Sequence, residues 1–120
     1  DLYALTDHDI RIGANETAIV HTGLAAEIPE GYVGLIFARS GLATKKGLAP
    51  ANKVGVIDSD YRGEIRVALH NDSKYMQSVE PYERVAQLVI MPYVCADIVE
   101  ADELSDTERG EGGFGSTGSK

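Results

Sequence analysis

Residues 55–63, Gly-Val-Ile-Asp-Ser-Asp-Tyr-Arg-Gly, hold the side chains best suited to chemistry in this chain of 120 residues. Asp58 offers a carboxylate that can accept a proton, and Tyr61 offers an aromatic ring close by in the sequence. Asp and Ser side chains favour turns, and an alternating apolar pattern resumes after Gly63. The segment therefore predicts a β-hairpin whose tip displays a carboxylate beside a phenol. An ordinary acidic turn has the same composition, so other segments must decide between the two.

A second segment, residues 38–48, combines a helix start with positive charge. Ser40 is a residue type that caps helices, and the first N–H groups of a helix can bind an anion. Arg39 adds a planar guanidinium suited to phosphate oxygens, and Lys45 and Lys46 follow on the same short element. The pattern is compatible with an anion site for phosphate, and equally with a surface helical turn that carries solvated lysines.

Residues 109–118 contain five glycines and cannot build a packed element. This composition is typical of a disordered terminus or an added tag, but a plain linker has no need for Arg109 or Phe114. Backbone N–H groups of such a segment can wrap phosphates, with Ser116 and Thr117 as hydroxyl donors. Phe114 can lie over a flat base, where stacking contributes about 1–3 kcal/mol. We expect a lid that orders on binding, and not a Walker A loop, since no Gly-Lys-Ser/Thr follows a strand.

Residues 83–92 read as a strand that ends at Pro92. Val85, Leu88 and Ile90 are expected to be buried in it. Gln87 is the polar exception in this run, and a satisfied amide in the core or at an edge would explain it without any function. Only its company in the other segments makes Gln87 a candidate for ligand binding.

Taken together and in this order, these segments resemble the five motifs of the trimeric dUTPase family. The first four residues look like the end of the first motif, whose preceding Ala-Gly is missing, so we expect the natural protein to begin earlier. In the second motif, Ala38 stands where the family usually has proline. The resemblance spans the whole chain, with the motifs at residues 1–4, 39–42, 55–63, 84–88 and 109–118.

The resemblance implies a fold and an assembly. Residues 1–108 are expected to form an all-β, jelly-roll-like sandwich or barrel, and residues 109–120 a flexible glycine-rich arm that closes over the active site. The family shares each site among three subunits, so a homotrimer with swapped arms is expected. Strand-like runs at residues 18–20 and 34–37 agree with an all-β chain, whose length suits one domain. The periodicity supports only the all-β class, and the trimer depends on the resemblance.

The resemblance also implies hydrolysis of dUTP to dUMP and pyrophosphate, which keeps uracil out of DNA and supplies dUMP for thymidylate synthesis. It makes Asp58 the base that activates a water for attack on the α-phosphorus. Mg²⁺ is held mainly by triphosphate oxygens and waters, with Asp1 as an outer-shell ligand through water. The residues implied for the phosphates are Arg39, Ser40, Gly41, Gln87, Arg109, Ser116 and Thr117. Those implied for uracil and deoxyribose are Asn52, Gly55, Val56, Ile57, Tyr61 and Phe114, with Tyr61 leaving no room for a 2′-hydroxyl.

Composition limits the other partners. The net charge of −8 and the pI of about 4.7 argue against binding long nucleic acid, which needs a basic surface. No apolar run approaches the roughly 20 residues that span a bilayer, so no membrane contact is expected. Cys95 is the single cysteine, and its apolar neighbours suggest a small core residue. A reducing compartment is expected: the cytoplasm, or the nucleus or host-cell interior for a eukaryotic or viral source.

Two other functions compete with this interpretation. A dCTP deaminase has a related fold, but that group carries Glu where this chain has Ala68, and tends to have Arg-Ser-Ser in place of residues 39–41. A non-catalytic nucleotide sensor would need neither Asp58 nor an intact tail. A structural protein of the viral jelly-roll type is a remote third alternative, because it explains none of the motif order.

Overall fold

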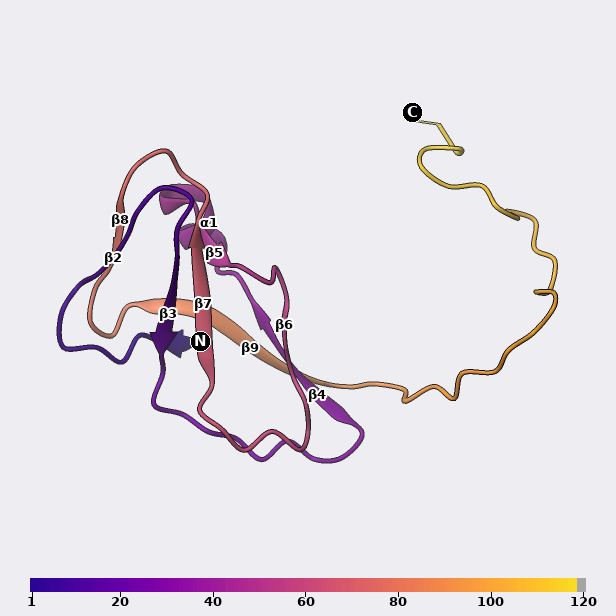
Figure 1. The fold of residues 1–120 in the computed structure, drawn as a ribbon, viewed down its shortest axis with the longest axis horizontal. Coiled ribbons are helices and arrows are strands. Elements are labelled where there is room, and N and C mark those ends of the chain that lie inside the picture. Colours follow the sequence, from indigo (N-terminus) through magenta and orange to yellow (C-terminus); the bar gives the residue numbers. More distant parts are fainter. Residues whose placement is uncertain (119–120) are drawn as a thin grey trace.

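The computed structural model describes residues 1–118, and its elements are nearly all strands (Figure 1). Residues 119–120, the end of the predicted arm, lie outside the described residues. The elements in chain order are β1 (Leu2–Tyr3), β2 (Ile10–Ile12), β3 (Thr17–His21), β4 (Tyr32–Phe37), α1 (Ser40–Lys46), β5 (Leu48–Pro50), β6 (Gly55–Ile57), β7 (Arg66–Asn71), β8 (Gln77–Val79) and β9 (Arg84–Pro92).

The strands form three antiparallel sheets around one core. A four-stranded sheet has the order β1-β9-β4-β6, a three-stranded sheet has the order β3-β7-β5, and β2 pairs with β8. One apolar cluster joins residues of the two larger sheets, including Ile36 and Val85 on one and Val67 and Leu69 on the other. This arrangement confirms the predicted all-β, jelly-roll-like fold. Alternation placed the inward face of β7 correctly, since Ile65, Val67 and Leu69 are buried.

The predicted β-hairpin at residues 55–63 is wrong. The strands on either side of the turn belong to different sheets: β6 pairs with β4, whereas β7 pairs with β3 and β5. Instead of pairing with β6, the backbone N–H of Ile65 donates to the carbonyl of Leu24 (2.7 Å). Residues 58–64 are therefore a connection between two sheets.

The helix start also differs from the prediction. Arg39 occupies the cap position of α1, with an extended backbone, and its carbonyl accepts the hydrogen bond from the N–H of Ala43 (3.0 Å). Ser40 is the first helical residue and makes no side-chain cap. The helix ends at Gly47, whose φ of 67° is the left-handed conformation that glycine adopts at little cost.

A long segment leaves the body of the chain after β9 (Figure 1). The hydrogen bond from the N–H of Tyr93 to the carbonyl of Gly31 (3.0 Å) ties its start to the body. The radius of gyration of 18.9 Å exceeds the roughly 14 Å of a compact chain of this length. Cys95 lies on this segment and is exposed, so its predicted core position is wrong. Ile90 and Met91, near the end of β9, are also about 45% and 43% exposed, because only β4 flanks that end of the strand.

Within residues 1–118, no helix has the length and apolarity needed to cross a membrane. The helix found there, α1, has seven residues.

Candidate active site

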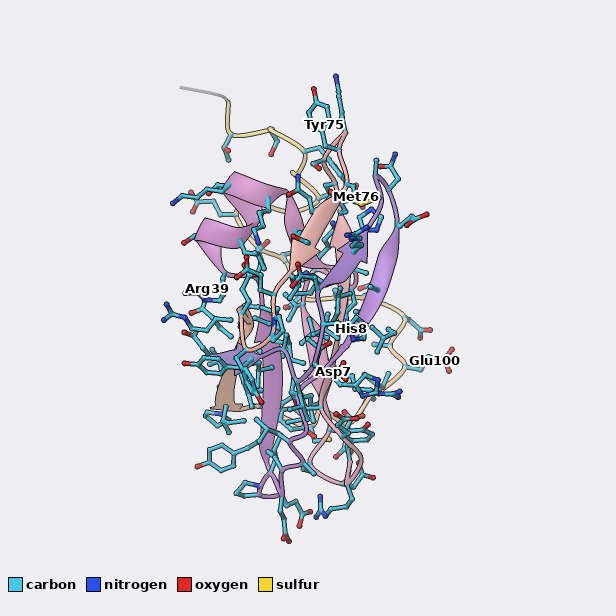
Figure 2. All side chains as sticks on the ribbon, turned by 90° about the vertical axis from the view of Figure 1, so that its left-hand side faces the viewer. Asp7, His8, Arg39, Tyr75, Met76 and Glu100 are labelled. Atoms are coloured by element: carbon cyan, nitrogen blue, oxygen red, sulfur yellow. The ribbon has the colours of Figure 1, made fainter. Side chains whose placement is uncertain are left out.

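The predicted site residues fall into separate groups, of which the first surrounds Asp1. Its carboxylate lies 3.3 Å from Nε of Arg39 and 3.4 Å from Nη1 of Arg84. Strand pairing explains the meeting, because Leu2 pairs with Ala86 in β9. Figure 2 shows Arg39 at the outer surface of the molecule. We call Asp1, Arg39, Ser40, Gly41 and Gln87 the Arg39 cluster.

Gln87 is placed in the Arg39 cluster by the register of β9 with β4. It pairs with Phe37, the last residue of β4, and its Nε2 donates to the carbonyl of Ala38 (3.0 Å). The side chain is therefore exposed at the sheet surface beside the start of α1, with its amide satisfied by backbone. Gly41 faces open space, since a Cβ added there meets no atom within 4 Å. An anion can thus approach the first turn of α1 beside Arg39.

The second group extends from the turn before β6, through β6, into the connection that follows it. We call Asn52, Gly55, Asp58 and Tyr61 the Asp58 cluster. The carbonyl of Asp58 accepts a hydrogen bond from the N–H of Tyr61 (3.1 Å), which closes a turn and leaves the Asp58 side chain exposed. The phenol of Tyr61 donates to the carbonyl of Glu64 (2.8 Å). The carboxylate and the phenol are thus displayed on one turn, as the sequence predicts.

Gly55 allows two neighbouring side chains to lie close to its backbone in the Asp58 cluster. A Cβ at this position would lie 3.1 Å from Cβ of Ile36 and 3.2 Å from Nδ2 of Asn52. Both are tighter than ordinary contacts, so the absence of a side chain lets the Asn52 amide lie over the β6 backbone. Val56 is 62% exposed and Ile57 is buried, so these two residues offer backbone groups rather than one shared side-chain surface.

Asp58 lines a hollow of about 950 Å³ between the connection and the preceding loop, residues 27–30. Tyr93 lies on its wall. A hydrogen bond with Cys95 is the largest cause that raises the pKa of the Tyr93 phenol, and the negative charges of Asp58 and Asp60 raise it further. The hollow is acidic and open, which suits a site that needs a second element to cover it.

A smaller hollow of about 270 Å³ lies beside Tyr61 and contains residues that the sequence interpretation missed. Glu64 and Arg66 line it together with Ala68, because alternate residues of the strand share a face. Ile19 enters it because β3 pairs with β7, with Ile19 opposite Ala68. The alternating pattern after Gly63 was a signal for Glu64 and Arg66, whereas nothing local pointed to Ile19.

The Arg39 cluster and the Asp58 cluster are far apart within one chain. Ile57 pairs with Gly34, so Asp58 lies level with Val33, four positions along β4 from the partner of Gln87. Two strand spacings also separate them, which together place Asp58 about 16 Å from Gln87. One chain therefore does not bring the predicted base to the predicted phosphate-binding residues.

The arm residues are also remote from both groups. Hydrogen bonds between residues 107 and 118 are local turns, such as Arg109 Nε to the carbonyl of Gly112 (2.7 Å). Phe114 is fully exposed. The end of the segment, drawn in yellow in Figure 1, lies away from the body, and residues 109–118 belong to it.

The fold and the separate residue groups define an all-β protein whose candidate polar residues lie apart within one chain. Residues 1–118 match the family model described as dUTPase. The chain therefore belongs to the dUTPase family, an enzyme family, which confirms the resemblance found in the sequence.

Similar proteins agree with this membership. The deoxyuridine 5′-triphosphate nucleotidohydrolase of Nautilia profundicola is 53% identical over 118 residues, 98% of this chain and 82% of that protein. A variant of the dUTPase of Staphylococcus bacteriophage 80alpha, solved with dUpNHpp, superposes with a TM-score of 0.88 at 31% identity, covering 98% of this chain and 84% of that one. A dUTPase variant from phage phi11 of S. aureus, described with a structural Mg(II) ion, has a TM-score of 0.75 at 25% identity, covering 86% and 82%.

Proposed function

We propose that the chain hydrolyses dUTP to dUMP and pyrophosphate with Mg²⁺, in active sites that three copies of the chain build together. The observation that carries this proposal is the exposed Asp58 carboxylate on one turn with Tyr61, in a chain of the dUTPase family. In the cytoplasm, this reaction would keep uracil out of DNA and supply dUMP for thymidylate synthesis.

Asp58 is the proposed general base. It takes a proton from a water aligned with the α-phosphorus, so that the water attacks as the bond to the β-phosphate oxygen breaks and pyrophosphate leaves. The exposed position of its side chain at the edge of the 950 Å³ hollow supports this role, because water can reach it. Asp60, two residues later, shapes the turn and has no catalytic part in this proposal.

The nucleoside is proposed to bind along the Asp58 cluster. The Asn52 amide and the backbone of Gly55, Val56 and Ile57 read the edge of uracil, and a wrong donor pattern would leave these groups unpaired. The Tyr61 ring packs against the deoxyribose and excludes a 2′-hydroxyl. Phe114 of an arm stacks over the base, which its full exposure leaves it free to do.

The triphosphate is proposed to bind the Arg39 cluster. Arg39, Ser40, Gly41 and Gln87 supply a guanidinium, backbone N–H groups, a hydroxyl and an amide. Arg109, Ser116 and Thr117 of an arm close over its far end. Arg39 supports this role because its guanidinium is only partly buried and its Asp1 contact, at 3.3 Å, is a long one that an anion can replace.

Asp1 is the residue proposed to hold Mg²⁺, through water. The donor set fits this outer-shell role: one carboxylate beside two guanidiniums is too few ligands for a protein cage, and no group of three acidic, His or Cys residues occurs among residues 1–118. Mg²⁺ commonly keeps waters and binds substrate phosphates with one or two carboxylates. When bound, the ion supplies positive charge that neutralises the triphosphate.

The proposed trimer has two supports in the structure. First, about 16 Å separates Asp58 from Gln87 in one chain, so a second copy must bring one of them. Second, the outer face of the four-stranded sheet is apolar and uncovered: Val56 and Val89 flank Leu35 on neighbouring strands and are 62% and 42% exposed. Such a face is typical of an interface between subunits.

Product analysis with Mg²⁺ and dUTP, beside dCTP, dTTP and UTP, tests the proposed reaction. We expect dUMP and pyrophosphate from dUTP alone. Intact dUTP in the presence of measurable binding would indicate a sensor, and conversion of dCTP would move the chain to the deaminases.

Replacement of Gly63 by alanine is expected to weaken sugar discrimination. The added Cβ would lie 2.5 Å from the hydroxyl oxygen of Tyr61 and 2.7 Å from Cζ, so the ring must move. We expect kcat/KM for dUTP to fall about tenfold or more, while that for UTP falls less. Steady-state kinetics with both nucleotides checks this. Gly41→Ala, whose added Cβ meets no atom within 4 Å, is a control for folding only, because Gly41 belongs to the proposed phosphate site.

A further inference from the structure

We infer that Glu64 is a positioning residue that holds Tyr61 in place and thereby sets the preference for deoxyribose over ribose. This inference rests on the proposed hydrolysis of dUTP. Glu64 lies beside Tyr61 in the 270 Å³ hollow, and its two ends make different contacts. Its carboxylate binds the end of β3, and its backbone carbonyl binds the Tyr61 phenol.

The carboxylate of Glu64 is held by two groups more than 40 positions away in the chain. Oε1 accepts a hydrogen bond from the N–H of Gly23 (2.9 Å), and Oε2 lies 2.8 Å from Nδ1 of His21. The side chain is 33% exposed, so these contacts are partly shielded from water. The Gly23 N–H, followed by His21, lowers the pKa of Glu64, which indicates that the contacts favour the ionised carboxylate. The contacts are therefore formed at neutral pH and lost as the pH falls into the acidic range.

The rest of the connection has few ties to the body. Arg62 donates to the carbonyls of Ser59 (2.7 Å) and Tyr61 (3.2 Å), which are bonds within the turn itself. Its ion pair with Glu27, at 3.6 Å, is solvent-exposed and contributes little. Because β6 and β7 do not pair, no ladder fixes this segment. Within the described residues, the Glu64 carboxylate is thus its main side-chain anchor.

The anchor reaches the sugar site through one hydrogen bond. The Tyr61 phenol donates to the carbonyl of Glu64 (2.8 Å), and Gly63 leaves the ring the space that it occupies. If the Glu64 side chain is lost, only the hydrogen bond from the Ile65 N–H to Leu24 (2.7 Å), among residues 1–118, still holds this planar peptide, so the phenol's partner is less firmly fixed. A shift of about 1 Å in a positioning group can change rates by as much as a hundredfold. Room for a 2′-hydroxyl is a matter of that same distance.

Glu64→Ala, tested with dUTP and UTP, is the direct experiment. We expect the ratio of kcat/KM for dUTP to that for UTP to fall about tenfold, chiefly through loss with dUTP. Glu64→Gln is expected to keep the ratio within about twofold, since its amide oxygen still accepts from Gly23. The variants should fold, because the backbone bond from Ile65 to Leu24 (2.7 Å) and the Thr22 hydroxyl bond to Ile65 (2.6 Å) do not involve the Glu64 side chain.

Glu16→Ala is the matched control. Its carboxylate likewise accepts a hydrogen bond from a glycine N–H, that of Gly13 (3.0 Å), in a turn between β2 and β3. An equal loss of the ratio in Glu16→Ala, or an unchanged ratio in Glu64→Ala, would overturn the inference.

A measurement without nucleotide separates this inference from the proposed function. Amide hydrogen exchange at Gly23 is expected to accelerate about tenfold or more in Glu64→Ala and to stay unchanged in Glu16→Ala. Unchanged exchange would overturn the anchor itself. A wild-type chain that leaves dUTP intact would instead refute the proposed function and, with it, the role in sugar discrimination.

Discussion

Asn in place of Asp58 is expected to lower kcat for dUTP by about 10²–10⁴-fold while dUTP binding stays within about threefold. The amide has nearly the shape of the carboxylate but is not basic at neutral pH. The turn should persist, because the Tyr61 N–H donates to the backbone carbonyl of Asp58, which the substitution keeps. Single-turnover hydrolysis and calorimetric titration with a non-hydrolysable dUTP analogue measure the two quantities separately.

Asp60→Asn is the matched control, because Asp60 is also exposed and lies on the same turn. It makes the same change in charge two residues away, and it is expected to retain most of the activity. A similar loss in both variants would mean that the local negative charge matters rather than a base at Asp58. Loss of binding in Asp58→Asn would show that Asp58 is structural.

Deletion of residues 109–120 is expected to lower turnover at least about tenfold while the melting temperature changes by less than about 3 °C. The hydrogen bonds within residues 107–118 are local turns, so the body does not depend on them. Activity is expected to depend on the arm, because the arm is proposed to cover the uracil base and the far phosphates. Kinetics and thermal unfolding of the same preparation provide the comparison.

Phe114→Ala separates stacking from phosphate contacts in the arm. The ring is fully exposed without ligand, so its removal should leave the melting temperature unchanged. The loss of stacking should weaken substrate binding by about 5- to 150-fold. A fall of more than about 10 °C in melting temperature after the full deletion would identify the arm as a structural element.

Local patterns predicted those parts of the fold that local physics decides. Alternation placed Val67 and Leu69 on the inward face of β7, and Pro92 marked the end of β9. The hairpin prediction failed because strand and turn propensities do not reveal which strands pair. Gly55 pairs with Ile36 of β4 rather than with the strand that follows.

Two other errors have similar causes. Ser40 has the chemistry of a cap, but the hydrogen bond from Ala43 reaches the Arg39 carbonyl and starts the helix one residue earlier. Cys95 has apolar neighbours, yet they lie on a segment that leaves the body, so composition alone misplaced it.

The candidate site was predicted as a set of residues but not as an arrangement. Residue types and order pointed to Asp58, Tyr61 and Arg39, because base, ring and phosphate chemistry each need a particular side chain. The sequence did not reveal that Asp1 contacts Arg39 or that Glu64 reaches Gly23. Both contacts join positions far apart in the chain, and pairing between strands decides them.

The division of the site between copies is the central claim, and complementation tests it most directly. Asp58→Asn and Arg39→Ala are each expected to be nearly inactive alone. After unfolding and refolding as an equimolar mixture, about one quarter of the sites should combine an intact Asp58 with an intact Arg39 from another copy. dUMP release should then recover to about that fraction of the native rate. A mixture no more active than either variant alone would show that one chain holds the whole site and would contradict the account.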